Sequence, residues 1–329
     1  MYKQEIYYGA PGTGKSYEVS KLLKDVNWRK IFRVTIHPEY TYSDFIGQIL
    51  PVLEQNGNTK FQFKPGPFTL ALKETYSDNS KDVYLVLEEL SRGNVAGIFG
   101  DIFQLLDRDN HFVSKYPIRN KNIADEIPTL LTDEIVLPSN FNILCTVNTN
   151  DQNVFPMDTA FKRRFDWMYI STKPARNDEG IVIKTLNNPQ FNIRISNSEA
   201  KTVSWQDFYT SLNEYITDKN KGMGKNEDKQ VGQFFIVFPE NDIKDTYSDN
   251  SDISKPAINR VENIIKNKLL QYLWQDVQGT SSFGDDNLLF DETINNFEKL
   301  YENYGTCKIF NDVFLNDFLL PNIGKYPYK

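Results

Sequence analysis

The sequence predicts an α/β domain with a parallel sheet, followed by a second domain that is mainly helical. Up to about residue 170, short apolar runs alternate with stretches of helical periodicity, which is typical of a parallel sheet covered by helices. From about Thr172 the strand-like runs stop, and helical patterns such as VENIIKNKLLQYLWQDV alternate with polar loops. We therefore expect an α/β domain over residues 1–172, and a helical domain with a C-terminal extension over residues 173–329.

The first elements of the α/β domain are predicted from short patterns near the N-terminus. Glu5–Tyr8 is a short run that is suited to a buried strand. Ser16–Lys24 is expected to form a helix, because Val19, Leu22 and Leu23 fall on one of its faces. Ile31–Ile36 is then a second strand. The chain thus begins with a strand, a helix and a strand, as a parallel sheet requires.

The remaining elements of this domain continue the alternation. The stretch PVLEQNGNTKFQFKPGP predicts a hairpin that turns at Asn56-Gly57. Val83–Leu87 is an apolar run suited to a central buried strand, and VAGIFGDIFQLLDR after it carries apolar residues at helical spacing. Phe141–Val147 predicts another buried strand and Phe165–Ile170 a last one.

Composition excludes several classes of protein. The 329 residues, 40% of them hydrophobic, are enough for two domains with real cores. A net charge of −7 argues against a surface that is basic overall and binds nucleic acid. Two cysteines, Cys145 and Cys307, form neither a disulfide framework nor a zinc motif, so we expect a cytoplasmic protein. Neither an apolar run of membrane-spanning length nor a leader peptide is seen, so we expect no membrane partner.

A glycine-rich loop follows the first strand. Gly9, Gly14, Lys15 and Ser16 fit the pattern G-x-x-x-x-G-K-[ST], the phosphate-binding loop or Walker A motif. Its backbone N–H groups would surround a triphosphate, with Lys15 at the β- and γ-phosphates and Ser16 on Mg²⁺. The predicted nucleotide-binding residues are Gly9, Ala10, Pro11, Gly12, Thr13, Gly14, Lys15, Ser16 and Tyr17.

Three further polar side chains are expected at the same edge of the sheet. Glu88 and Glu89 follow the central apolar strand, at the carboxyl end where open α/β sheets bind their ligands. We expect Glu88 to hold the Mg²⁺ shell and Glu89 to orient and deprotonate the attacking water. Asn148 ends the next buried strand, which would bring its amide near the γ-phosphate; an Asx-turn that closes the strand is the alternative.

A pair of arginines, Arg163 and Arg164, precedes the last strand. The planar and permanently charged guanidinium is suited to stabilising charge on a transferred phosphoryl group. Because both arginines lie far along the chain from the glycine-rich loop, we expect them to act on the nucleotide of a neighbouring subunit in a closed ring. For either arginine alone, a basic turn that pairs with local carboxylates is an equally good interpretation.

Taken together, these motifs resemble an AAA+ ATPase module, and more narrowly the AAA+ motor of McrB, the GTP-hydrolysing subunit of McrBC modification-dependent restriction systems. The resemblance runs from about residue 5 to about residue 275. It rests on the stretches TIHPEYTYSDFIGQ, KPGPFTLAL, EELSRGNVAGIFGDIFQLL, TVNTNDQN, MDTAFKRRF and VGQFFIVF.

The resemblance implies an AAA+ core with a helical lid, a ring that is a hexamer, GTP as the substrate with ATP as the alternative, and Mg²⁺. It also implies a McrC-like nuclease partner, and contact with DNA through that complex in a restriction or anti-phage defence system. By position, Asp151 joins the nucleotide-binding set. Only eight residues precede the loop, so we expect the recognition of DNA targets to lie outside this sequence.

Some positions depart from the family pattern. Glu88 stands where the family has aspartate, and Gln152 and Asn153 replace an Arg-Ser pair. Gln233 stands where many AAA+ lids have a sensor arginine. Two other functions therefore stay open: a MoxR-like chaperone ATPase, and a nucleotide-binding assembly module with weak turnover.

Overall fold

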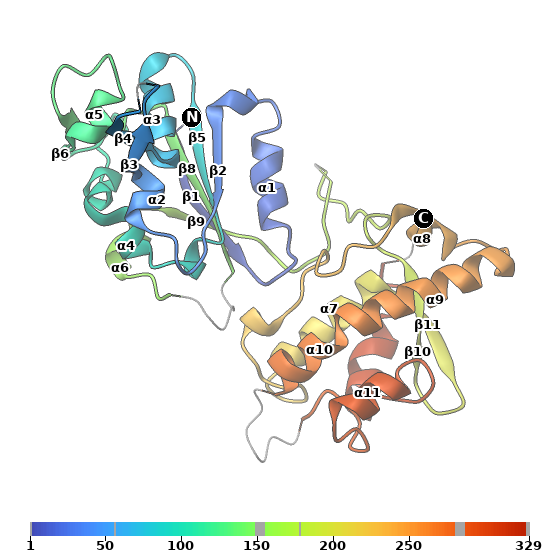
Figure 1. Ribbon diagram of the computed structural model, residues 1–329. Coiled ribbons are helices and arrows are strands. Elements are labelled where there is room, and N and C mark those ends of the chain that lie inside the picture. The colour runs from blue at the N-terminus through green and yellow to red at the C-terminus, as the bar shows by residue number, and fades with distance from the viewer. Residues whose placement is uncertain (1, 56, 149–154, 178, 280–286, 327–329) are drawn as a thin grey trace. The chain divides into compact units, whose positions relative to one another are not determined.

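The computed structural model describes residues 2–55, 57–148, 155–177, 179–279 and 287–326 (Figure 1). Its contacts form two compact units, residues 1–9 with 15–170, and residues 10–14 with 171–329. The tip of the glycine-rich loop thus belongs to the second unit, while the residues on either side of it belong to the first.

A five-stranded parallel sheet forms the centre of the first unit, as the sequence predicts. Its strand order is β2-β5-β8-β1-β9, so the strand that carries the glycine-rich loop lies inside the sheet. The strands are β1 (Gln4–Gly9), β2 (Ile31–Thr35), β5 (Val83–Glu88), β8 (Phe141–Asn148) and β9 (Asp166–Tyr169). Their carboxyl ends meet at one edge, which brings the predicted catalytic residues of β5 and β8 beside the loop of β1.

The alternation of side chains along each strand produces two buried faces. In β5, Leu85 and Leu87 join the larger core, whereas Tyr84 and Val86 face the opposite side. Helix α1 (Lys15–Leu22) covers that opposite side and contributes Val19 to its core. Glu88 has the same parity as Tyr84 and Val86, so its side chain is expected on the α1 side of the sheet.

Short helices cover the larger face. They are α2 (Tyr42–Ile46), α3 (Pro67–Ser77), α4 (Val95–Phe99), α5 (Lys121–Asp125) and α6 (Thr159–Lys162), and a small ribbon of β6 (Ile118–Arg119) and β7 (Glu134–Ile135) lies with them. The apolar stretch VAGIFGDIFQLLDR is not one regular helix. Gly100, with φ of +49°, ends α4, and a 3₁₀ helix follows over Gly100–Leu106.

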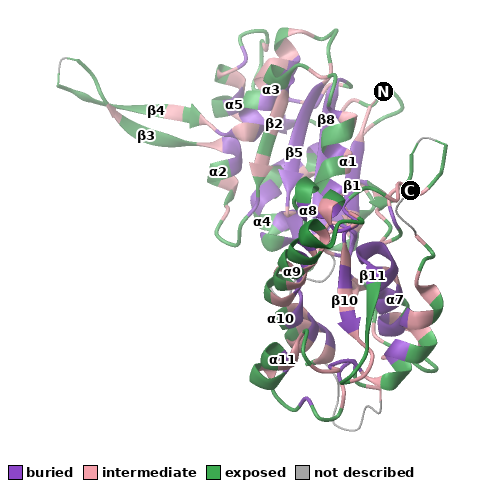
Figure 2. Ribbon diagram, turned by 90° about the vertical axis from the view of Figure 1, so that its right-hand side faces the viewer, coloured by how far each residue is buried: buried purple, intermediate pink, exposed green. Residues whose placement is uncertain are grey.

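The predicted hairpin is formed by β3 (Gly47–Leu53) and β4 (Thr59–Pro65), which pair antiparallel. Figure 2 shows that it extends away from the rest of the first unit as an exposed two-stranded ribbon. One residue of the predicted turn, Asn56, lies outside the described residues. Gly57 N donates to Glu54 O at 2.9 Å and Glu54 N donates to Asn58 O at 2.8 Å, so the chain reverses between Glu54 and Asn58, the segment that contains the predicted Asn-Gly pair.

The second unit is mainly helical, but it also contains a pair of strands that was not predicted from the sequence. Strands β10 (Gln190–Arg194) and β11 (Ala200–Ser204) form an antiparallel hairpin, so the expectation that strands end near residue 172 was wrong. The helices are α7 (Trp205–Thr217), α8 (Glu240–Asp245), α9 (Ser251–Lys268), α10 (Leu270–Tyr272) and α11 (Phe297–Asn303), with π-helical turns over Leu273–Gln278 and Phe314–Leu319. None of the helices within the described ranges combines the length and apolarity that a membrane crossing requires.

The importance of the larger core can be tested with a matched pair of phenylalanine variants. Phe141 in β8 is fully buried (0% exposed), whereas Phe61 in the hairpin is 71% exposed. We expect Phe141→Ala to lower the free energy of unfolding by about 3–5 kcal/mol, because it removes buried contacts and leaves a cavity. Phe61→Ala should change it by less than about 0.5 kcal/mol. Urea denaturation of both variants measures the difference; equal effects would contradict the assignment of the core.

Candidate active site

The glycine-rich loop joins β1 to α1 through a backbone that favours glycine. Gly12 and Gly14 have φ of +76° and +94°, in the left-handed region. Within the second unit, Gly232 N donates to Pro11 O and Phe234 N donates to Gly12 O, both at 2.8 Å. These bonds occupy two loop carbonyls, whereas the groups of such a loop that suit an anion are its backbone N–H groups.

Lys15 opens helix α1, and its side chain folds back along the loop. The residue is buried, and Nζ donates to the carbonyl oxygen of Gly9 at 3.1 Å. An ammonium held in a glycine-rich turn at a helix N-terminus suits the phosphates of a nucleotide in charge and position.

Glu88 is the centre of a polar cluster on the α1 side of the sheet. Ser16 Oγ donates to its Oε2 at 2.9 Å, and Thr146 Oγ1 donates to the same oxygen at 2.5 Å. Arg33 Nη1 lies 2.6 Å from the other oxygen, Oε1. A serine hydroxyl beside a carboxylate is a donor set that suits Mg²⁺, so Ser16 and Glu88 fit the metal-binding role expected of them.

Glu89 lies just past the end of β5 in a strained backbone conformation. Its φ of 56° and ψ of 40° are left-handed, which is uncommon for a residue with a side chain. Asn148 Nδ2 donates to both carboxylate oxygens, at 3.0 and 2.8 Å, and Arg92 Nε lies 3.3 Å from one of them. The two predicted catalytic side chains of this edge are therefore in direct contact.

Burial changes the acidity of one nearby group. The Cys145 thiol lies in β8, next to Thr146, and is fully buried. Desolvation, with a smaller contribution from the charge of Glu88, raises its pKa well above the usual value. Cys145 therefore stays a neutral thiol and acts as a core residue rather than as a nucleophile.

The two arginines lie at the amino ends of the strands, opposite the carboxyl ends that hold Lys15, Glu88 and Glu89. They precede β9, which runs parallel to β1 with Asp166 beside Glu5, whereas the glycine-rich loop follows the last residue of β1. Because a strand rises ~3.3 Å per residue, about 20 Å separate the two edges. In this chain, therefore, neither arginine lies at the carboxyl ends of the strands.

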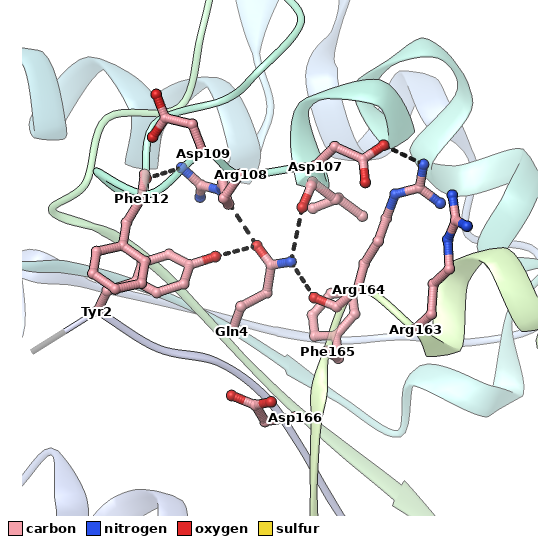
Figure 3. A pocket seen from close by; sticks show the side chains of 11 residues that line it. Tyr2, Gln4, Asp107, Arg108, Asp109, Phe112, Arg163, Arg164, Phe165 and Asp166 are labelled. Atoms are coloured by element: carbon pink, nitrogen blue, oxygen red, sulfur yellow. Dashed lines mark hydrogen bonds and ion pairs between the residues drawn. The ribbon is translucent and has the colours of Figure 1, made fainter.

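The two arginines have different surroundings (Figure 3). Arg164 is nearly buried, with 10% of its side chain exposed; Nη2 lies 2.5 Å from Asp107, Nη1 donates to Ala160 O, and the guanidinium lies over the Phe103 ring. Arg163 is exposed. Arg164 therefore fits the interpretation that it pairs with a local carboxylate. Arg163 is the arginine whose side chain is free of such burial and can reach another molecule.

A polar pocket of about 350 Å³ lies beside these arginines (Figure 3). Gln4, at the start of β1, donates through Nε2 to Leu106 O and to the carbonyl oxygen of Arg164. Arg108 donates from Nη1 to Leu137 O at 2.7 Å, and burial lowers its pKa to about 10. Of these bonds, the one from Gln4 to the carbonyl oxygen of Arg164 holds the backbone next to Arg163.

The structure adds three residues to the site, and one predicted site residue, Asp151, cannot be placed. Arg33, Thr146 and Arg92 contact the paired glutamates. Arg33 in the middle of β2 and Thr146 near the end of β8 are polar residues inside apolar runs, which was the signal available for these two. Asp151, like Gln152 and Asn153, lies outside the described residues. Gln233 is buried and accepts a hydrogen bond from Ala175 N at 2.8 Å, so it links loops of the second unit.

Comparison with known proteins identifies the family of this chain. A family model described as AAA domain (dynein-related subfamily) matches residues 6–165. Component YdiS of the type II restriction enzyme BsuMI from Bacillus subtilis (strain 168) is 34% identical over 306 residues, which cover 84% of this chain and 79% of YdiS. The chain belongs to the McrB-like AAA+ proteins.

A second relative agrees with this assignment. The EcoKMcrB subunit of a type IV methyl-directed restriction enzyme from Escherichia coli (strain K12) is 25% identical over 229 residues, which cover 68% of this chain and 44% of that subunit. The resemblance on which the sequence analysis relied is thereby confirmed, as is the α/β core followed by a helical lid. Membership in this family makes the chain a nucleoside triphosphatase of a restriction system.

Proposed function

We propose that this McrB-like AAA+ protein hydrolyses GTP as part of a ring, a hexamer by family resemblance, and drives a McrC-like nuclease partner that acts on DNA in the cytoplasm. The single observation that carries the enzymatic part is the direct contact of Glu89 with Asn148 at the carboxyl edge that also holds Lys15 and Glu88. An assembly module without turnover has no need for a carboxylate held in this strained position.

Nucleotide binding is the task of the loop and of the first turn of α1. The backbone N–H groups of residues 10–14 and the Lys15 ammonium provide the positive surface for the phosphates. Ser16 and Glu88 would hold Mg²⁺. When bound, Mg²⁺ neutralises phosphate charge, which is its usual contribution to phosphoryl transfer.

Hydrolysis requires a water molecule that is both oriented and deprotonated. Glu89 is the general base, and Asn148 orients its carboxylate through two hydrogen bonds. Arg92 Nε lies 3.3 Å from Glu89 Oε2, and this ion pair is a further contact that holds the carboxylate in place. Charge that develops on the γ-phosphate is stabilised by Lys15 and by Arg163 of a neighbouring subunit.

Assembly in a ring is supported by the position of the arginines. Arg163 is exposed at the amino edge of the sheet, about 20 Å from the catalytic edge of its own chain. An arginine at that position serves a nucleotide only when a second copy presents its own loop to it.

The substrate is tested by measuring steady-state hydrolysis of GTP and ATP by the same preparation, with and without a McrC-like partner. We expect GTP to have the higher kcat/KM. A clear preference for ATP would contradict the proposal that GTP is the substrate, but the chain would still be a nucleoside triphosphatase. Sedimentation with a non-hydrolysable GTP analogue then reports the oligomeric state; a persistent monomer would contradict the ring.

A further inference from the structure

The carboxylate that is expected to serve Mg²⁺ already has a cation beside it. Arg33 Nη1 lies 2.6 Å from Glu88 Oε1, and the other oxygen, Oε2, accepts hydrogen bonds from Ser16 and Thr146. Both oxygens of Glu88 thus have protein partners. A divalent cation that approaches Glu88 meets a positive charge on the same carboxylate.

The fold positions Arg33 for this contact. It lies in the middle of β2, the edge strand, where it pairs with Val86 and projects to the α1 side of the sheet. There Nη2 donates to Ser20 Oγ of helix α1 at 3.3 Å. The Arg33 side chain thus contacts helix α1 and also the carboxylate of Glu88 on the neighbouring strand β5.

The two partners differ in how freely they can move. The Arg33 side chain is 38% exposed, whereas the Glu88 side chain is only 11% exposed and is held by two hydroxyl groups. A long arginine side chain on an edge strand can turn toward water, where it regains its hydration, while Glu88 stays in place. The ion pair can therefore break by movement of the Arg33 side chain, while Glu88 keeps its position.

We infer that Arg33 and a divalent cation compete for Glu88, so that Arg33 is a built-in antagonist of Mg²⁺ at the nucleotide site. This inference rests on the proposed function, because it assigns a regulator to the same site. Its consequence is that Mg²⁺ improves nucleotide binding only at concentrations high enough to displace or repel the guanidinium. Arg33 is a positioning residue of the metal-free state, not a catalytic residue.

The test measures binding rather than turnover. Fluorescently labelled GTP is titrated into the protein in EDTA and at a series of Mg²⁺ concentrations, for the wild type, Arg33→Met and Arg33→Gln. Labelled ATP replaces it if ATP is the better substrate. An opposite charge within ~4–6 Å weakens proton binding at a carboxylate by one or more tenfold steps. We expect the charge of Arg33 to weaken Mg²⁺ binding in the same way, so both variants should need about tenfold less Mg²⁺ for the half-maximal effect. For each variant, its own affinity for nucleotide in EDTA is the reference from which the effect of Mg²⁺ is measured.

Two controls make the result specific. Arg33→Lys keeps a cation at the position and should keep the Mg²⁺ requirement near that of the wild type. Arg29→Met removes a nearby exposed arginine that contacts the Trp28 ring, and should change nothing. If Arg33→Met and Arg33→Gln need as much Mg²⁺ as the wild type, or more, the competition is refuted while the proposed function stands. If the wild type binds neither nucleotide at any Mg²⁺ concentration, both the inference and the proposed function fail.

Discussion

Replacing Glu89 with glutamine is expected to lower the rate of nucleotide hydrolysis by about 10²–10⁴-fold, the range that a general base contributes. Glutamine keeps the size of the side chain and still accepts a hydrogen bond from Asn148 through its amide oxygen, but it is not able to take a proton from water. Steady-state release of phosphate measures the rate, and a fluorescent nucleotide measures the affinity, which should be unchanged.

A matched control separates this effect from a general loss of charge. Glu134 lies in the small β6–β7 ribbon and pairs with Arg119 at 3.1 Å, away from the catalytic edge of the sheet. Glu134→Gln should hydrolyse nucleotide at the wild-type rate. If Glu89→Gln also kept that rate while the wild type is active, another residue would have to be the base. If the wild type itself has no turnover, with or without a partner, the assembly-module interpretation is favoured instead.

The sheet could be predicted because its strands are local patterns. The central strands β5 and β8 are apolar runs, and buried parallel strands favour such runs. The β10–β11 hairpin was missed for the opposite reason. In QFNIR and AKTVS only Phe191, Ile193 and Val203 face a core, so the apolar signal of each strand is weak.

The site was only partly visible in the sequence, because its contacts join separate strands. Glu88 and Glu89 were found from the strand that precedes them, whereas the partners Arg33 and Thr146 depend on the pairing of β2 and β8 with β5. Strand order and register follow from tertiary packing, and no local pattern specifies them. The different environments of Arg163 and Arg164 depend likewise on Asp107, which the chain brings near only when folded.

The arginines provide the second large effect. We expect Arg163→Ala to lower hydrolysis by about 10³–10⁵-fold, the range that an arginine finger supplies, while the variant folds normally because the side chain is exposed. Arg164→Ala should instead lower the melting temperature, since it breaks the ion pair with Asp107 and the contact with the Phe103 ring. Arg119→Ala, which removes another exposed arginine, is the control and should leave the rate unchanged.

Mixing two inactive variants distinguishes action in trans from action in cis. In a mixed ring, an Arg163→Ala subunit keeps its own Glu89, and a neighbouring Glu89→Gln subunit keeps its own Arg163. Where these two intact residues meet across an interface, the site is complete, so the mixture should recover hydrolysis that neither variant shows alone. If Arg163 acted within its own chain, every subunit of the mixture would lack one of the two groups and no activity would return. Because the two residues lie at opposite edges of one sheet, we expect recovery.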